Sequence, residues 1–393
     1  LSYVGQSIRD NSESPPSVLV SELMDYIGQG FELPGQDVIA GHILTRHRLQ
    51  AFSSAYFRGG RLFSYSRENL RASQAIQPAR CSPAPFISSP LAEPEPERRR
   101  LSLQTLAEFL RHPARFLATQ RLGIQLLSAG AALEEREPFA IDSLDGYLLK
   151  EELLELRLAD LRVQDSRQLI RASGRLPAGI AGDIHYAQLG RDVEAFFKQL
   201  QPYKPKNFDP PVSFDLEVGD FLISGHFSRI TPAGLLFYRP ATIKPKDLLH
   251  AWVEHLLWNA IEREEKPATT VVLGTKSLWN ISPVAEPLPV LEQLLQLYWT
   301  GLSQPLKFFP ESSYAFAKAD FKVRNGNAGK TVKQPMDFAQ EKWNGNDFGT
   351  PGECEDAYFT LFFKDGDVLD DDFEERARTV FDPFFECAQE TEL

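Results

Sequence analysis

The stretch Ile223–Pro240 has the layout of a site that binds Mg²⁺ beside a phosphate group, but not the residues of one. Its two apolar strands are separated by Thr231–Gly234, where proline and glycine favour a reverse turn. A magnesium site needs hard oxygen ligands, and a neighbouring cation helps to bind the phosphate. Paired strands can supply both, because residues two positions apart on a strand point to the same face.

The positions where such ligands would stand are held by Ser228, Phe237 and Arg239. In nucleases of the PD-(D/E)XK type, a glycine precedes an aspartate by three residues, and acid-x-lysine follows on the next strand. Alignment on Gly225 puts Ser228 at the aspartate position, and Phe237 and Arg239 then stand at the acid and lysine positions. The stretch resembles that core with its catalytic and metal positions degenerate, so no catalytic or metal residue is predicted. An unrelated antiparallel pair of strands is the open alternative.

Three other polar clusters match known site motifs incompletely. Gly329–Thr331 resembles the end of a phosphate loop but lacks its first glycine. His250, Glu254 and His255 do not have the spacing of a zinc-protease helix, and an i,i+4 surface pair with a packed histidine is expected instead. The acids of 365–372 lack the order of a calcium loop and favour a helix N-terminus.

Composition limits the class of protein. The 393 residues carry 54 acidic and 42 basic side chains, a net charge of −12, so DNA contacts would have to come from local basic patches. Cys81, Cys354 and Cys387 are scattered, which predicts a reducing compartment without a disulfide framework. Apolar runs are too short for a membrane span. Because the chain starts at Leu1 rather than Met, we expect a piece of a longer protein.

The order of predicted elements indicates an α/β protein with more than one domain. We expect a strand at Leu1–Val4, a helix after Ser17, and a proline-rich linker over 73–100. From Leu101 the pattern gives helices, antiparallel strands, a long helix, strands and helices, typical of a mixed sheet flanked by helices. The main elements expected there are a helix capped by Ser102 and interrupted at His112-Pro113, helices over 144–170 and 183–200, strands over 214–218, 221–230 and 235–238, a helix opened by Lys244-Pro245, a hairpin of 270–273 with 277–281, and a helix over 289–302.

Short motifs across most of the chain resemble one family, the gamma subunits of bacterial exodeoxyribonuclease V, or RecC family. They spread from residue 1 to about 315, and the last 80 residues or so match only loosely. The motifs are Leu1–Glu13 with Pro16–Val20, Arg111–Phe116, Glu137–Phe139, Leu176–Gly179, Gly234–Leu236 with Arg239-Pro240, Trp252–Leu256, and Pro305-Leu306 with Pro310–Ser312.

The resemblance implies a division of the chain. Residues 1–48 would end a degenerate superfamily 1 helicase-like domain, in which Arg9 would have to serve as the ATP-directed arginine. Residues 49–100 would be a loop-rich linker, and 101–393 an inactive domain of the PD-(D/E)XK restriction-endonuclease type. It further implies a bacterial cytoplasmic protein with RecB-like and RecD-like partners, acting on double-stranded DNA ends and single strands. ATP and Mg²⁺ would belong to the partner subunits, with no cofactor in this chain, and recognition of the Chi sequence would lie outside it.

The resulting hypothesis is a non-catalytic region that scaffolds a helicase–nuclease complex and helps to split and guide DNA strands during repair of double-strand breaks by homologous recombination. Candidate phosphate contacts are basic side chains near predicted loops, each with a plain surface charge as its alternative: Arg98, Arg99, Arg100, Lys244 and Lys246. Two rival functions stay open. One is an active Mg²⁺-dependent nuclease with carboxylates relocated to Asp215, Glu217 or Asp220. The other is a protein-interaction domain that does not contact DNA.

Overall fold

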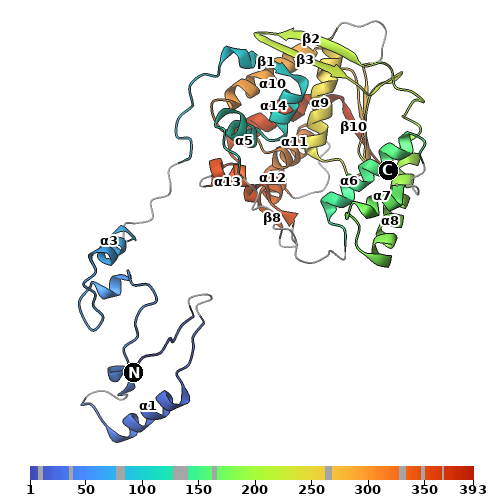
Figure 1. The fold of residues 1–393 in the computed structure, drawn as a ribbon. Coiled ribbons are helices and arrows are strands. Elements are labelled where there is room, and N and C mark those ends of the chain that lie inside the picture. The colour runs from blue at the N-terminus through green and yellow to red at the C-terminus, as the bar shows by residue number, and fades with distance from the viewer. Residues whose placement is uncertain are drawn as a thin grey trace. The chain divides into compact units, whose positions relative to one another are not determined.

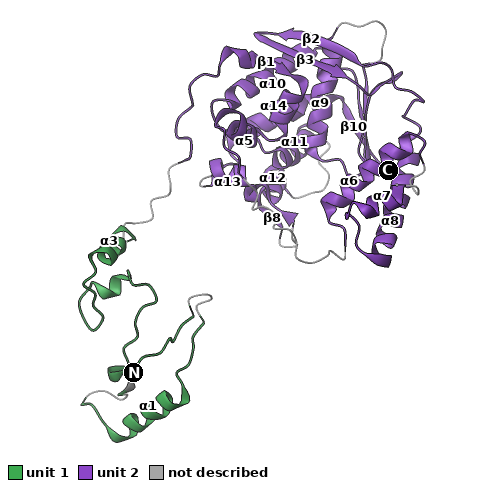
Figure 2. Ribbon diagram, viewed as in Figure 1, with its two compact units in different colours: residues 1–83 green, residues 84–393 purple. Residues whose placement is uncertain are grey.

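A computed structural model describes the chain except for nine short segments, and it contains two compact units (Figure 2). The smaller unit spans residues 1–83 and the larger 84–393. The boundary falls inside 49–100, where the sequence predicted a linker. The segments outside the described residues are 8–11, 35–38, 77–84, 127–139, 162–165, 262–267, 327–332, 347–349 and 365–366.

The smaller unit has little buried core in its described part. Its helices are α1 (Val18–Gly30), α2 (Ala40–Ile43), the 3-10 turn η1 (Ser54–Tyr56) and α3 (Arg67–Ile76). The strand predicted at Leu1–Val4 is wrong: that segment has no regular structure, and a single bridge joins Gln6 to Glu13. Ser17 precedes α1 as predicted, although its side chain makes no capping hydrogen bond. Arg9 lies outside the described residues.

The larger unit alternates helices and strands (Figure 1). Its helices are α4 (Leu103–Arg111), α5 (Pro113–Phe116), α6 (Ser143–Leu158), α7 (Arg167–Ala172), α8 (Gly179–Leu200), α9 (Pro245–Ala260), α10 (Pro287–Gly301), α11 (Pro310–Arg324), α12 (Pro335–Asn344), α13 (Ala357–Phe363) and α14 (Asp371–Cys387), with short turns η2 (Pro96–Arg99), η3 (Leu117–Arg121) and η5 (Glu353–Glu355). Its strands are β1 (Arg100–Ser102), β2 (Val212–Val218), β3 (Phe221–Phe227), β4 (Ile230–Thr231), β5 (Gly234–Tyr238), β6 (Thr270–Leu273), β7 (Ser277–Ile281), β8 (Gly345–Asn346), β9 (Thr350–Pro351) and β10 (Ala388–Glu392).

The strands form mixed sheets, as the sequence predicted. The principal sheet has the order β10-β7-β6-β5-β4, and only its β5–β6 pair is parallel. The predicted hairpin of 270–273 with 277–281 is confirmed as β6 and β7. A second sheet, β1-β3-β2, combines a parallel and an antiparallel pair, and β8 pairs with β9.

The strand predicted over 221–230 is divided in the structure, which corrects the predicted hairpin. β3 ends at Phe227 and pairs with β1 on one edge and β2 on the other, so it has no edge left for β5. After Ser228 and Arg229, the short strand β4 pairs with β5 instead. The predicted reverse turn between Thr231 and Gly234 joins these two strands, and the φ of +120° at Gly234 favours a residue without a side chain.

Helices cover both faces of the principal sheet because its buried residues alternate along each strand. Leu235, Val272 and Trp279 belong to the cluster that includes α9, α10 and α14. Their neighbours Leu236, Leu273 and Leu278 belong to a second cluster, formed with α6, α7 and α8. The mixed α/β class with flanking helices is therefore confirmed.

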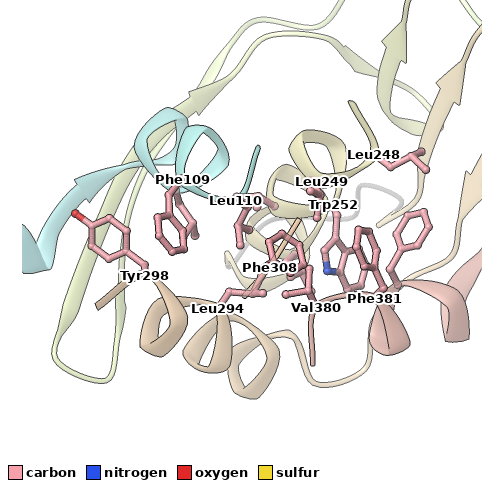
Figure 3. Close-up of a cluster of buried hydrophobic side chains, with 14 of the residues drawn as sticks. Phe109, Leu110, Leu248, Leu249, Trp252, Leu294, Tyr298, Phe308, Val380 and Phe381 are labelled. Atoms are coloured by element: carbon pink, nitrogen blue, oxygen red, sulfur yellow. The ribbon is translucent and has the colours of Figure 1, made fainter. Parts of the chain in front are cut away.

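The main core is built where four helices meet (Figure 3). Phe109 of α4 packs edge-to-face on Tyr298 of α10, with ring centroids 5.4 Å apart. Trp252 of α9 contacts Phe384 of α14 in the same edge-to-face manner at 5.7 Å. Such aromatic pairs stabilise a core beyond the apolar area that they bury. This packing holds α9 in place, and the first turns of α9 line a pocket at the end of β5.

Local capping follows the predictions for α4 and α9. Ser102 Oγ accepts the backbone N–H of Thr105 at 3.1 Å and starts α4. The helix stops at His112-Pro113, where His112 Nδ1 accepts the N–H of Arg115 and starts α5. Pro245 begins α9 as predicted. The helix expected over 144–170 is two helices, α6 and α7. Among the described helices, none combines the length and apolar character that crossing a bilayer requires.

Candidate functional site

A pocket of about 370 Å³ brings together Ser228, Phe237 and Arg239, the three residues that the sequence analysis predicted at degenerate metal-site positions. It lies where the end of β5 meets the first half of α9, with side chains from α4, α6 and the β3–β4 junction completing the wall. The residues that line it are Arg111, Tyr147, Ser228, Arg229, Leu235, Phe237, Tyr238, Arg239, Ile243, Lys246, Asp247, His250, Glu254 and Val272.

Ser228 and Phe237 give this pocket no metal ligand of the expected kind. Ser228 is exposed between β3 and β4. Phe237 is half-buried on β5, and its ring packs edge-to-face against His250 with centroids 6.1 Å apart. A phenyl ring cannot coordinate a cation, and a lone hydroxyl is a weak ligand for Mg²⁺.

Arg239 is held in place by its neighbours. Its guanidinium forms an ion pair with Asp247 and lies over the ring of Tyr147, 4.6 Å from the centroid. Asp247 also accepts the backbone N–H of Lys244 at 2.9 Å, which satisfies a free donor at the start of α9. The Arg239–Asp247 pair therefore joins the end of β5 to the start of α9.

The other carboxylate that lines the pocket is also paired. Glu254 Oε1 lies 2.8 Å from His250 Nε2, one turn earlier on α9, which confirms the predicted i,i+4 pair. His255 is fully buried, as predicted, and its Nδ1 lies 2.8 Å from Thr270 Oγ1. These residues do not fit a magnesium site, because each lining carboxylate already has a basic partner.

Basic side chains outnumber acids among the residues that line this pocket. Four cations line it (Arg111, Arg229, Arg239 and Lys246) against two carboxylates (Asp247 and Glu254), a formal balance of +2 with His250 neutral. Burial lowers the pKa of Lys246, and nearby positive charge lowers it further. The pocket is therefore a local positive site on a chain whose net charge is −12.

Of the five predicted phosphate contacts, Lys246 alone lines this pocket. Lys244 is exposed next to it, at the N-cap of α9. Arg98 is engaged with Glu95 at 3.1 Å and with the carbonyl of Gln120 at 2.9 Å. Arg100 is exposed at the start of β1.

Arg99 has mainly structural contacts. It forms an ion pair with Asp220, and its guanidinium lies over the ring of Trp299, 4.6 Å from the centroid. A cation in this position is held by an acid and an aromatic face.

The acids proposed as relocated ligands lie elsewhere. Asp215 and Glu217 are exposed on β2, opposite Ser224 and Leu222 of β3, and Asp220 pairs with Arg99. None of the three lines the pocket. Over the described ranges, no group of three or more His, Cys, Asp or Glu side chains is arranged to hold a metal ion.

The remaining motifs are placed as follows. Gly329–Thr331 lies outside the described residues, as does Asp365. Asp370 caps α14, accepting the N–H of Phe373 at 3.2 Å, which confirms the helix N-terminus predicted there. Its carboxylate also pairs with Lys307.

Sequence reasoning missed four polar residues of the pocket: Arg111, Tyr147, Arg229 and Asp247. Arg229 directly follows Ser228, so its position was accessible from the sequence. Arg111 and Tyr147 come from α4 and α6, and no sequence periodicity links those helices to β5.

Comparison with known proteins adds what the geometry alone does not give. A family model described as the RecC C-terminal domain matches residues 98–321, more than half of the chain. The chain belongs to the RecC C-terminal domain family. This confirms the resemblance drawn from the motifs and covers every element that lines the pocket.

Relatives of this RecC-family chain carry one name, RecBCD enzyme subunit RecC. The protein from Escherichia coli K12 is 29% identical over 339 residues, covering 83% of this chain and 29% of its own length. One from Mycobacterium tuberculosis H37Rv is 26% identical over 90% of this chain and 32% of its own length. One from Buchnera aphidicola of Acyrthosiphon pisum is 22% identical over 91% and 33%. The chain thus spans about a third of the length of these relatives.

Proposed function

We propose that this chain is a non-catalytic region of a RecC-type subunit, which scaffolds a RecBCD-type helicase–nuclease and helps to split and guide DNA strands during recombinational repair. Its larger unit would have a PD-(D/E)XK restriction-endonuclease type of fold retained without an active site. Residues 1–48 would end a helicase-like domain. RecB-like and RecD-like subunits would be its partners, supplying the ATP and Mg²⁺ chemistry.

The observation that carries the proposal is the pocket formed at Ser228, Phe237 and Arg239. Cleavage of a phosphodiester with Mg²⁺ needs anionic oxygen ligands that are free to bind the ion. At these three positions stand a hydroxyl, a phenyl ring and a guanidinium, and the guanidinium is paired to Asp247. A basic pocket of this kind is suited to attracting a phosphate, and its residues are not a ligand set for cutting one.

The proposed role in a RecBCD-type complex is supported by the chain's membership of the RecC C-terminal domain family. Proteins named RecBCD enzyme subunit RecC share sequence with most of this chain. A subunit that keeps a sheet, its flanking helices and a basic pocket is suited to holding a strand in place while a partner acts on it. The prediction of an active nuclease with relocated acids gains no support, because Asp215 and Glu217 lie on a β2 face outside the pocket.

The test is a pair of assays on the 393-residue chain. Binding of a forked DNA duplex is followed by fluorescence anisotropy between 50 and 200 mM salt, and the same DNA is incubated with chain and Mg²⁺. We expect salt-sensitive binding and no cleavage products. Cleavage that disappears in Asp220→Ala would replace the proposal with an active nuclease. If the chain shows no salt-sensitive DNA binding but still captures a RecB-type subunit, the proposed function would be replaced by that of a protein-interaction domain.

A further inference from the structure

The carboxylates that line the pocket all have basic partners, whereas most of the lining cations have no acidic partner within the described part of the chain. Its two lining carboxylates each have a basic partner: Asp247 has Arg239 and Glu254 has His250. Among the described residues, Arg111, Arg229 and Lys246 form no ion pair, and Arg229 instead lies over the ring of Tyr238. Three of the four lining cations therefore have no carboxylate paired with them.

Burial makes this imbalance costly. Lys246 is half-buried, and its desolvation lowers its pKa. The charges of Lys244, Arg111 and Arg239 act in the same direction, and the carboxylate of Asp247 offsets only part of the effect. The Nε of Arg239 is buried and has no hydrogen-bond partner among the described residues. An unpaired buried donor and clustered positive charge are both relieved when an anion enters.

We propose that this pocket binds one phosphate group of a single-stranded nucleic acid, with Arg111, Arg229 and Lys246 around the phosphate oxygens. The proposal rests on the proposed function, in which the chain handles DNA strands, and it names the place of one contact. Arginine suits this role because its planar guanidinium can donate two parallel hydrogen bonds to phosphate, while lysine acts as a point charge.

The shape of the pocket favours a nucleotide over an acidic peptide. A volume of about 370 Å³ suits one small group rather than an extended segment or a duplex. Tyr147, Phe237 and Tyr238 contribute aromatic surface to the wall, and single-stranded nucleic acids are typically held by positive charge combined with aromatic faces. Arg229 already lies over the Tyr238 ring at 4.2 Å, so one side chain could serve both functions.

Neighbouring acids limit the site to a small anion. Glu155 lies near enough to Tyr238 to hydrogen-bond with it, and Glu151 accepts a hydrogen bond from Tyr147. Glu311 is close enough to Lys246 for their charges to interact. These carboxylates confine the positive charge to the lining of the pocket, which suits one phosphate group rather than several anionic groups at once.

The first experiment measures binding of 5′-phosphorylated oligothymidylate to the 393-residue chain by anisotropy. The variant Arg111→Gln/Lys246→Gln removes two of the three unpaired charges, and Lys198→Gln/Lys322→Gln removes two exposed charges from α8 and α11 as a matched control. We expect at least a tenfold weaker Kd and a shallower salt dependence for the pocket variant only. Unfolding midpoints of both variants are compared with the parent, so that loss of the fold is not mistaken for loss of the contact.

The second experiment locates the contact directly. Lysines are acetylated with and without the oligonucleotide, and modification of Lys246 is quantified by mass spectrometry against Lys198 and Lys322. We expect several-fold protection of Lys246 alone. DNA binding without that protection, equal losses in both double variants, or equal protection by polyglutamate would overturn the pocket assignment and leave the proposed function standing. Absence of any DNA binding would overturn both.

Discussion

Arg239 pairs with Asp247 across the junction of strand β5 and helix α9. Both side chains are mostly shielded from water, with 17% and 23% of their surfaces exposed. The aspartate also accepts the N–H of Lys244 at 2.9 Å, so one carboxylate connects the sheet, the helix start and the pocket. Arg239, which the sequence analysis predicted at the position of a nuclease lysine, therefore has a structural role.

Asp247→Asn should lower the free energy of unfolding by about 1–2 kcal/mol, between the values typical of exposed and fully buried pairs. The amide oxygen can still accept from Lys244, so the change isolates the ion pair. Denaturant unfolding measures the loss. Asp337→Asn is the matched control, because Asp337 accepts the N–H of Gln334 at 2.7 Å at the start of α12 and has no arginine partner among the described residues. Equal losses in the two variants would show that the pairing with Arg239 contributes nothing.

The sequence predicted what local patterns determine. The helix opened by Lys244-Pro245 and the hairpin of β6 and β7 were both correct, because proline placement and alternation of apolar residues are local signals. The division of 221–230 was missed, since it depends on β1, more than 100 residues earlier, occupying one edge of β3. Arg111 and Tyr147 were missed at the pocket for the same reason: only packing of α4 and α6 brings them there.

Arg99→Ala is expected to destabilise the larger unit by about 1 kcal/mol, because it removes the contact with the Trp299 face and the partner of Asp220. Arg100→Ala serves as the control, since Arg100 is exposed and should change the free energy of unfolding by less than about 0.5 kcal/mol. Thermal and denaturant unfolding measure both. A role of Arg99 in phosphate binding alone predicts the reverse pattern: weaker binding of forked DNA with an unchanged unfolding midpoint.

Glu353 gives the stability a dependence on pH. Burial raises its pKa to about 7, although the carboxylate accepts the N–H groups of Glu311 at 3.0 Å and Ser312 at 2.8 Å. The folded state therefore binds this proton more tightly than the unfolded state, whose carboxyl titrates near 4.5. Between those two values the free energy of unfolding falls as pH rises, by a few kcal/mol at most.

Replacing the carboxyl removes this dependence, so Glu353→Gln should gain stability relative to the parent as the pH is raised from 5 to 8. Denaturant unfolding at both pH values measures the difference between the two proteins, which cancels titration elsewhere in the chain. Glu355→Gln, an exposed change two residues away, is the control. A difference between Glu353→Gln and the parent that stays constant across this range would contradict the assignment.

Gly301, the last residue of α10, leaves no room for a side chain against α4. A methyl group there would lie 2.5 Å from Cε2 of Phe109 and 3.0 Å from Cδ1 of Leu306, both core residues. Gly301→Ala should therefore cost about 1–3 kcal/mol through overpacking, despite the better helix propensity of alanine. Gly146→Ala on α6 meets only Ile141 Cγ2 at 3.8 Å, an ordinary contact, and should be neutral or slightly stabilising. Phe109 packs on Tyr298 in the same core that holds α9 in place, so the Gly301→Ala variant should also bind oligothymidylate less tightly. If that variant is destabilised but its binding is unchanged, the pocket does not depend on this packing.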